Sequence, residues 1–268
     1  MAESFSADWL ALREPVDHRS RPLELLPPLL GWWVERGAAR VVDLGSGTGS
    51  NLRYLGPRLG VGQRWRLVDH DAALLARAER SRGQIDGVAS LETVRGDLAA
   101  EGIAAVADAE LVTASALLDL VSRPWLDALV DACLAARCAA LFALTWDGEL
   151  RFEPADRDDA FVADAVREHQ RRDKGLGAAL GPTGCDEARR RFEGAGWRTT
   201  VASSPWVLGP DERELALSLL RGFEQAAIEQ RPEAEARVRA WAERQRASVR
   251  SDFRLVVGHA DLLALPPG

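Results

Sequence analysis

Residues 41 to 51 of the chain read Val41-Val42-Asp43-Leu44-Gly45-Ser46-Gly47-Thr48-Gly49-Ser50-Asn51. Two β-branched residues and an acid run into a turn that has glycine at every second position. Because glycine has no Cβ and accepts positive φ, a ligand can approach bare backbone in such a turn. The loop then opens a helix over residues 51–55. The segment therefore predicts a strand, a ligand-binding loop and a helix, in that order.

The spacing of these glycines differs from that of a dinucleotide-binding loop. The dinucleotide fingerprint G-x-G-x-x-G needs its third glycine three places after the second. Here Gly49 comes one place early, and Ser50 stands where the fingerprint has glycine. The block resembles motif I of the class I S-adenosylmethionine-dependent methyltransferases, in which an acid also precedes the first glycine. The resemblance implies S-adenosylmethionine as cofactor, with contacts from Asp43, Gly45, Ser46, Gly47, Gly49 and Asn51.

Two further acids follow in the order that the resemblance requires. Residues 66–71 form a short apolar strand that ends in acids, about 20 residues after the glycines. Asp69 matches the family residue that accepts hydrogen bonds from both ribose hydroxyls, and His70 beside it is a further expected contact. Asp71 is predicted to cap the helix over residues 72–80.

A third strand ends at Asp97, which matches the family residue that binds the adenine amino group, with Leu98 beside it. Ionised carboxylates suit these targets because they only accept hydrogen bonds, whereas hydroxyls and an amino group donate them. A single Asp after a strand is usually a turn residue or a helix cap. Three acids in the expected order favour a nucleoside site.

Residues 110–121 look like the fourth-strand motif of the family, whose carboxyl end borders both cofactor and substrate. Ser115 and Leu117 are expected to line that end. Asp119 has two interpretations: it caps a following helix, or it faces the substrate.

The overall composition indicates a globular enzyme. The chain has 268 residues, of which 47% are hydrophobic, and a formal net charge of −7, which argues against a nucleic-acid partner. We find no apolar run long enough for a membrane span and no signal peptide at the N-terminus. The three cysteines fit a reducing cytoplasm, and no cluster has the spacing of metal ligands. Of the 34 Lys and Arg residues, only Lys174 is a lysine.

The order of the predicted elements indicates the fold. Strands and helices alternate over residues 40–146, which predicts right-handed crossovers and a largely parallel sheet. Late strands at 197–202 and 253–262 fit the sixth and seventh strands of the family. The resemblance implies an α/β, Rossmann-like, doubly wound sheet of seven mostly parallel strands in the order 3-2-1-4-5-7-6.

Additions to this core are expected to form the substrate pocket. We expect residues 1–36 to form an N-terminal helical cap and residues 37–268 to form the cofactor-binding domain. Helical insertions at 148–184 and 205–252 are predicted to cover the substrate. Pro27-Pro28 predicts a helix boundary or kink within the cap.

Arg13 is the residue of the cap with the clearest chemical role. A guanidinium fork matches the carboxylate of S-adenosylmethionine, and the alternative is an ion pair with Glu14 or Asp17. Together, residues 9–19 and 169–182 resemble segments of a group of bacterial small-molecule methyltransferases. Gly175, Gly177 and Gly181 predict that the second of these segments is a hinged lid.

Three side chains are candidates for acceptor chemistry: His169, Asp119 and Asp147. His169 lies at helical spacing from Asp173, which is predicted to orient the imidazole as a base, and the alternative is a structural or solvated histidine. Asp147 is expected just past the fifth strand. We therefore predict a cytoplasmic methyltransferase that acts on an O, N or C atom of a small molecule. The alternatives are a non-catalytic S-adenosylmethionine-binding or scaffold protein, and an NAD(P)-dependent Rossmann oxidoreductase.

Overall fold

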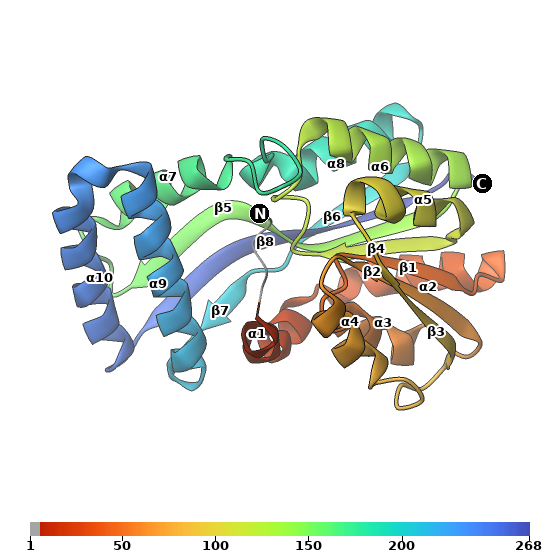
Figure 1. Ribbon diagram of the computed structural model, residues 1–268, viewed down its shortest axis with the longest axis horizontal. Coiled ribbons are helices and arrows are strands. Elements are labelled where there is room, and N and C mark those ends of the chain that lie inside the picture. The colour runs from red at the N-terminus through yellow and green to blue at the C-terminus, as the bar shows by residue number, and fades with distance from the viewer. Residues whose placement is uncertain (1–5) are drawn as a thin grey trace.

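A twisted sheet of eight strands runs through the computed structural model, which describes residues 6–268 (Figure 1). Residues 1–5 of the predicted cap lie outside the described residues. In chain order the strands are β1 (Arg40–Leu44), β2 (Gln63–Asp69), β3 (Val88–Arg95), β4 (Leu111–Ser115), β5 (Ala139–Glu153), β6 (Arg198–Ser203), β7 (Trp206–Leu208) and β8 (Arg254–Leu265).

The order of strands across the sheet is β3-β2-β1-β4-β5-β8-β6, and β7 pairs with β8. Strands β1 to β5 are parallel, whereas β8 runs antiparallel to β5, β6 and β7. The predicted order is therefore confirmed, with the last strand of the chain inserted beside the fifth. The short strand β7 was not predicted.

Strand β7 continues the edge that β6 begins. Both strands pair with β8, at Ser203↔Ala260 and then at Trp206↔Val257. Between them lies Pro205, which has no backbone N–H to donate to a ladder. The edge is thus one strand interrupted at proline, which explains why residues 197–202 alone had the pattern of a strand.

The helices are α1 (Ala7–Ser20), α2 (Leu26–Arg36), α3 (Ser50–Leu55), α4 (Ala72–Glu79), α5 (Ile103–Ala105), α6 (Arg123–Ala136), α7 (Asp159–Gln170), α8 (Gly184–Gly194), α9 (Arg213–Gln230) and α10 (Glu235–Val249). Alternate residues of each strand face opposite sides of the sheet. Val41 packs with α2, α3 and α4, while Val42 packs with α5, α6 and α8. The two helical layers are visible below and above the sheet in Figure 1.

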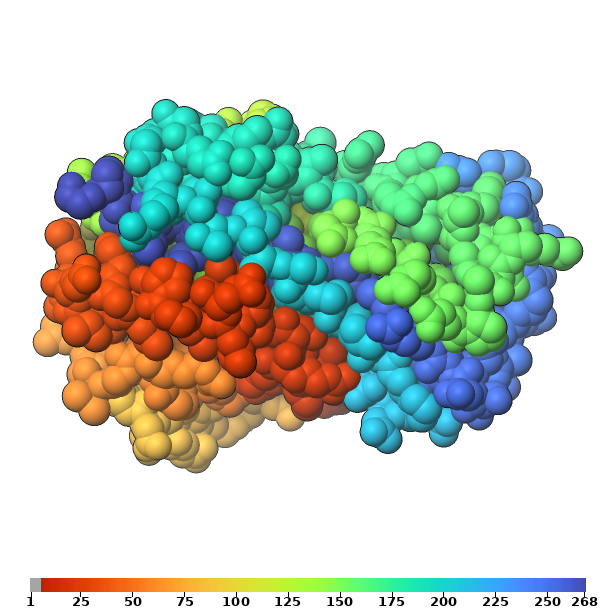
Figure 2. Space-filling model, turned by 180° about the vertical axis from the view of Figure 1, so that it is seen from behind, coloured from red at the N-terminus to blue at the C-terminus, as the bar shows by residue number. Residues whose placement is uncertain are grey.

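A third core lies where β5 and β8 extend beyond the other strands. Helices α7, α9 and α10 cover this end of the sheet around Phe152 and Trp241. The two rings pack edge to face, with their centroids 5.5 Å apart. From behind, Figure 2 shows the red N-terminal residues from the left edge to the centre and blue residues, which include those of α10, at the right end. The molecule is therefore elongated along β5 and β8.

The length of β5 corrects the predicted start of the first insertion. Asp147-Gly148 reads as a turn, so the strand was expected to end at Trp146. Instead, the register of β5 on β8 shifts between Trp146 and Leu150, and the strand continues to Glu153. Gly148 has a φ of +93°, which only glycine adopts easily, and this bulge lets the pairing resume. Residues 148–153 thus belong to the sheet.

Two other features of the described residues concern the cap and the environment. Pro27 and Pro28 lie in the first turn of α2, so they mark a helix boundary. Among residues 6–268, no helix is long and apolar enough to cross a membrane.

Candidate functional site

The glycine loop lies between β1 and α3, at the carboxyl end of the central strands. Gly45, Gly47 and Gly49 have φ angles of +62°, +53° and +82°. A Cβ at Gly45 would lie 3.7 Å from Leu117 and 3.8 Å from Leu98, beside the cavity that these side chains line. Glycine therefore keeps the backbone exposed where the ligand is expected.

A cavity of about 320 Å³ opens directly over this loop. Of the twelve predicted cofactor residues, eight line it: Arg13, Gly45, Gly47, Asp69, His70, Asp97, Leu98 and Ser115. Its other walls are Leu10, Leu74, Ala116, Leu117, Leu120, Lys174, Gly175 and Leu176. The cavity thus collects residues from the ends of β1, β2, β3 and β4, from α1 and α4, and from the segment after α7.

Asp69 is buried at the end of β2 and holds the loop. Its Oδ2 accepts a 2.8 Å hydrogen bond from the Gly47 amide, and its Oδ1 accepts a 2.9 Å bond from the Asp71 amide. The Nδ1 atom of His70 lies 3.3 Å from the same Oδ1. A carboxylate offers about four acceptor positions, so Asp69 retains capacity for further donors.

Asp97 also lines the cavity, two residues after the end of β3. Its Oδ1 accepts a 2.7 Å hydrogen bond from the Ala99 amide and so caps the short helical turn that follows β3. Within residues 6–268 its Oδ2 has no hydrogen-bond partner. One acceptor oxygen of Asp97 is therefore available to a ligand.

Asp43 and Asn51 lie beneath the loop, where they join a buried network. The Asn51 amide donates 3.0 Å and 3.1 Å hydrogen bonds to Asp43 and Thr113, and its oxygen accepts a 2.9 Å bond from Arg21. Burial raises the pKa of Asp43 to about 7, against the effects of the Asn51 hydrogen bond and the charge of Arg21. These side chains support the loop from below.

The cation of this network, Arg21, was not predicted from the sequence. Arg21 forms a 2.7 Å ion pair with Asp261, and the two side chains are only 4% and 1% exposed. Asp261 also accepts hydrogen bonds from the Leu144 amide and the Ser204 hydroxyl. Arg21 and Asp261 are 240 residues apart, and no local pattern marks them as partners.

A smaller cavity of about 50 Å³ continues under the loop and is lined by Asp43, Ser46 and Asn51, among others. The Ser46 hydroxyl is buried there without a hydrogen-bond partner in the described part of the chain. Gly49, the remaining predicted contact, lines neither cavity. Its φ of +82° shapes the start of α3 instead.

Arg13 lines both cavities and also has a protein partner. Its Nε donates a 2.9 Å hydrogen bond to Asp17. Its guanidinium carbon lies over the Trp206 ring, 4.9 Å from the ring centroid. The alternative partner, Glu14, pairs with Arg53 at 2.5 Å. Arg13 is thus a pre-positioned cation at the edge of the cavity.

The three candidates for acceptor chemistry lie in different places. Asp119 is buried and does not line the cavity, and its Oδ1 has no partner within residues 6–268. Burial raises its pKa to about 6. Ser122, rather than Asp119, is the residue before the first turn of α6, so Asp119 does not cap that helix.

Asp147 does not lie past the fifth strand, as expected, but within it. It is exposed in the bulge of β5, and its Oδ1 accepts a 2.9 Å hydrogen bond from the Glu149 amide. It lines none of the cavities described in this section. The continuation of β5 carries this side chain away from the site.

His169 lines a separate cavity of about 540 Å³ between α1, α7 and α9. Its Nε2 lies 2.9 Å from Glu229 Oε2, so its partner is Glu229 and not Asp173. Asp173 instead accepts hydrogen bonds from the amides of Gly175 and Gly177. Burial lowers the pKa of His169, against the effect of the hydrogen bond with Glu229.

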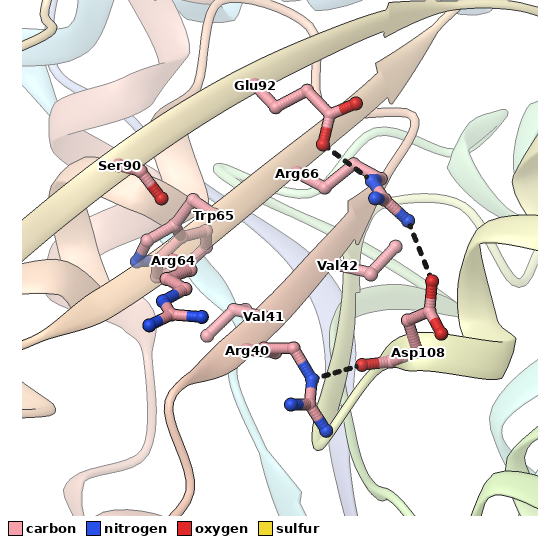
Figure 3. A pocket seen from close by; sticks show the side chains of 9 residues that line it. All are labelled: Arg40, Val41, Val42, Arg64, Trp65, Arg66, Ser90, Glu92 and Asp108. Carbon is pink, nitrogen blue, oxygen red and sulfur yellow. Dashed lines mark hydrogen bonds and ion pairs between the residues drawn. The ribbon is translucent and has the colours of Figure 1, made fainter.

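A further cavity lies at the other end of the strands and has a different character. Figure 3 shows this pocket of about 170 Å³, in which Arg66 pairs with Glu92 at 2.9 Å and with Asp108 at 3.7 Å. Ligands of open α/β sheets bind beyond the carboxyl ends of the strands. We therefore assign the candidate site to the cavity over the glycine loop. Among residues 6–268, no group of three or more His, Cys, Asp or Glu side chains is arranged to hold a metal ion.

Comparison with known proteins adds to this description. No family model matches the chain, and no curated protein matches it. Among solved structures, the chain is similar to a cyclopropane-fatty-acyl-phospholipid synthase-like protein from Lactobacillus casei, with a TM-score of 0.56 at 13% identity over 99% of this chain and 96% of that one. The chain has the class I methyltransferase fold.

Two solved S-adenosylmethionine-dependent methyltransferases, from Thiobacillus denitrificans and Geobacter sulfurreducens, also match. Both are complexes with S-adenosylhomocysteine, and each has a TM-score of 0.45 at 15% identity. The matches cover 99% and 100% of this chain and 100% of each of those chains.

Proposed function

We propose that the chain is an S-adenosylmethionine-dependent methyltransferase that acts on a small-molecule metabolite. The observation that carries the proposal is the convergence of Asp69, Asp97 and the exposed backbone of Gly45 and Gly47 on one cavity. Two carboxylates at the ends of neighbouring strands suit the hydroxyls and amino group of a nucleoside, which are hydrogen-bond donors. The bare backbone between them suits the part of the ligand that needs close approach.

The chemistry of the lining fits the rest of the cofactor. Arg13 supplies a guanidinium at the edge of the cavity, where a carboxylate would be held. The buried Ser46 hydroxyl offers an unused hydrogen-bonding group under the loop. Leu98, Leu117 and Leu176 form apolar walls, which favour the adenine ring and the methylene groups of the methionine chain.

S-adenosylmethionine supplies a methyl group that is already activated on a sulfonium. The protein's contribution is to hold the acceptor in line with that methyl group and to exclude water. The cavity of about 540 Å³ that His169 lines is the second cavity of interest. It shares Lys174 with the cavity over the glycine loop. A space for an acceptor next to the cofactor site favours an enzyme over a non-catalytic binding protein.

The amino-acid composition supports the proposed cellular compartment and the proposed class of acceptor. The three free cysteines are buried, which fits a reducing compartment, and the proposal places the enzyme in the cytoplasm. The net charge of −7 argues for a small-molecule acceptor rather than a nucleic acid.

Calorimetric titration tests the cofactor assignment. S-adenosylhomocysteine and S-adenosylmethionine are expected to bind with dissociation constants well below about 1 mM, and NADH is expected to give no heat. Absence of binding by both adenosyl compounds up to about 1 mM, where the binding free energy is only about −4 kcal/mol, contradicts the assignment. Binding of NADH alone supports an oxidoreductase instead.

Methyl transfer itself requires a second measurement. Incubation with S-adenosylmethionine carrying an isotopically labelled methyl group and a bacterial metabolite extract is expected to place the label in the low-mass fraction. If the cofactor binds but no fraction gains label, the scaffold alternative is supported. If the label enters nucleic acid or protein, the proposed acceptor class is wrong.

A further inference from the structure

The second cavity has the composition of a site for a partly apolar, polar-tipped molecule. It lies between α1, α7 and α9, and its volume of about 540 Å³ exceeds that of the cofactor cavity. Trp9, Leu219 and Phe223 supply apolar surface. The His169–Glu229 pair supplies a hydrogen-bonding group on another wall, from α7 and α9.

Lys174 joins the two cavities. It lines both of them, and the consecutive residues Trp9 and Leu10 line one each. Lys174 is therefore placed to contact a molecule that extends from the second cavity toward the cofactor site. Helix α1 and the segment after α7 both contribute to the cofactor cavity, since Leu10 and Arg13 line it together with Lys174.

Lys174 is half-buried, and its ammonium group has no partner among residues 6–268. It makes no hydrogen bond or ion pair with any residue in the range 6–268, whereas the nearby Arg231 pairs with Glu168 at 2.6 Å and Arg172 donates to the Glu229 carbonyl. An ammonium is a compact charge with three donors, so the unpaired group of Lys174 can donate to an acceptor oxygen that a ligand supplies.

The positive charge of Lys174 affects the pKa of two groups, Asp119 and His169. Burial raises the pKa of Asp119, and the charges of Arg13 and Lys174 oppose this increase. Burial lowers the pKa of His169, and the charge of Lys174 lowers it further. Lys174 thus lies close both to the fourth-strand end of the cofactor site and to the His169–Glu229 pair.

We propose that the second cavity binds the methyl acceptor and that this acceptor carries an anionic oxygen, a carboxylate or an ionised hydroxyl, which Lys174 holds at the join. This inference rests on the proposed methyltransferase function. A protonated amine would meet two positive charges here, the ammonium and the cofactor sulfonium, whereas an anionic oxygen is attracted by both. The apolar surface of Trp9 and Phe223 then accommodates an aromatic or aliphatic body.

The proposed step needs no further reactant. The ionised oxygen forms a bond to the methyl carbon as the carbon–sulfur bond breaks, and the electron pair of that bond remains on sulfur. The negative charge of the oxygen and the positive charge of the sulfonium cancel, so no proton moves. The role of Lys174 is to position the oxygen and keep it ionised.

The single lysine of the chain makes a direct occupancy test possible. Acetylation of Lys174 by acetic anhydride is followed by mass spectrometry in the presence of S-adenosylhomocysteine, with the chain's α-amino group as the internal control. Benzoate, octanoate and 4-nitrophenolate represent an aromatic carboxylate, an aliphatic carboxylate and an ionised hydroxyl. At least one of them is expected to slow acetylation of Lys174 about threefold or more, while benzamide and benzylamine do not.

Binding of the protective anion is then compared in three variants. Lys174→Gln and Arg171→Gln each remove one positive charge, whereas Lys174→Arg keeps it. Lys174→Gln is expected to weaken anion binding about tenfold or more, and Lys174→Arg is expected to restore most of the affinity. Arg171→Gln removes an exposed cation three residues away that lines neither cavity, and it is expected to leave anion binding unchanged.

The outcomes separate this inference from the function on which it rests. If S-adenosylhomocysteine does not bind, the proposed function fails. If it binds but no anion protects Lys174, or benzylamine protects it equally, the acceptor class is wrong. Equal anion binding by Lys174→Gln and the wild type also overturns the inference.

Discussion

The amide of Gly47 donates a 2.8 Å hydrogen bond to Oδ2 of Asp69. This contact ties the glycine loop after β1 to the carboxylate at the end of β2, so that the two expected cofactor-binding elements are fixed to each other before any ligand arrives. Asp69 therefore has a role in the protein itself, in addition to the proposed contact with the ribose.

Replacement of Asp69 by asparagine is expected to weaken S-adenosylhomocysteine binding by about 1–3 kcal/mol, because an amide offers one acceptor oxygen where the carboxylate offers two. Calorimetric titration measures this loss. Asp86→Asn is the matched control, since Asp86 is exposed and lines none of the described cavities, and its affinity is expected to equal that of the wild type. An unchanged affinity in Asp69→Asn would remove Asp69 from the site.

The buried Arg21–Asp261 pair is expected to be essential for stability. Asp261→Asn leaves the Arg21 guanidinium buried without its counter-charge, so the free energy of unfolding should fall by roughly 3–5 kcal/mol. Urea denaturation measures this loss. Glu92→Gln removes the exposed partner of Arg66 and should change stability by only about 0–1 kcal/mol. Similar losses in both variants would show that the buried network has no special importance.

His259 should make the fold sensitive to acid. Burial lowers its pKa to about 3, and the charge of Arg13 acts in the same direction, whereas an unfolded histidine has a pKa of about 6.5. Below about pH 6.5 the unfolded chain binds a proton that the native chain does not, so this contribution to stability is complete above that pH and is lost as the pH falls.

Exchange of His259 for asparagine removes this proton uptake. Between about pH 7 and pH 5, the free energy of unfolding of His259→Asn should rise relative to the wild type by about 2 kcal/mol. Denaturation curves of both proteins at the two pH values give this difference directly. A difference that does not vary with pH would mean that the native state protonates His259 normally.

The start of α8 is expected to tolerate no side chain. A Cβ at Gly184 would lie 2.3 Å from the Leu118 carbonyl oxygen, a backbone atom of the segment that follows β4. Gly184→Ala should therefore cost about 1–3 kcal/mol of stability through overpacking. At the other end of the same helix, a Cβ at Gly194 would meet no atom of residues 6–268 within 4 Å, so Gly194→Ala should be neutral or slightly stabilising. Equal melting temperatures for the two variants would contradict this contact.

The parts of the structure that the sequence predicted are those that depend on neighbouring residues. The glycine spacing was visible in the sequence, and Asp43, Asp69 and Asp97 lie in or just after the ends of three strands that the parallel sheet brings together. The order of the sheet was implied by the family resemblance, which the two late strands fit. These features are set by local pattern and by the topology that the resemblance implied.

The features that were not predicted depend on contacts between distant residues. Asp147-Gly148 has the local pattern of a turn, and only pairing with β8 makes it a bulge within β5. His169 pairs with Glu229, which is 60 residues away, rather than with nearby Asp173. Lys174 had no motif of its own, although its status as the single lysine was visible from the start.

A crystal structure of the protein with S-adenosylhomocysteine shows directly whether the nucleoside occupies the cavity over the glycine loop. We expect the ribose hydroxyls within hydrogen-bond distance of Asp69, the adenine amino group near Asp97, and the amino-acid tail on the glycine loop. Adenosine bound elsewhere, or Asp69 and Asp97 both turned away from it, would contradict the account.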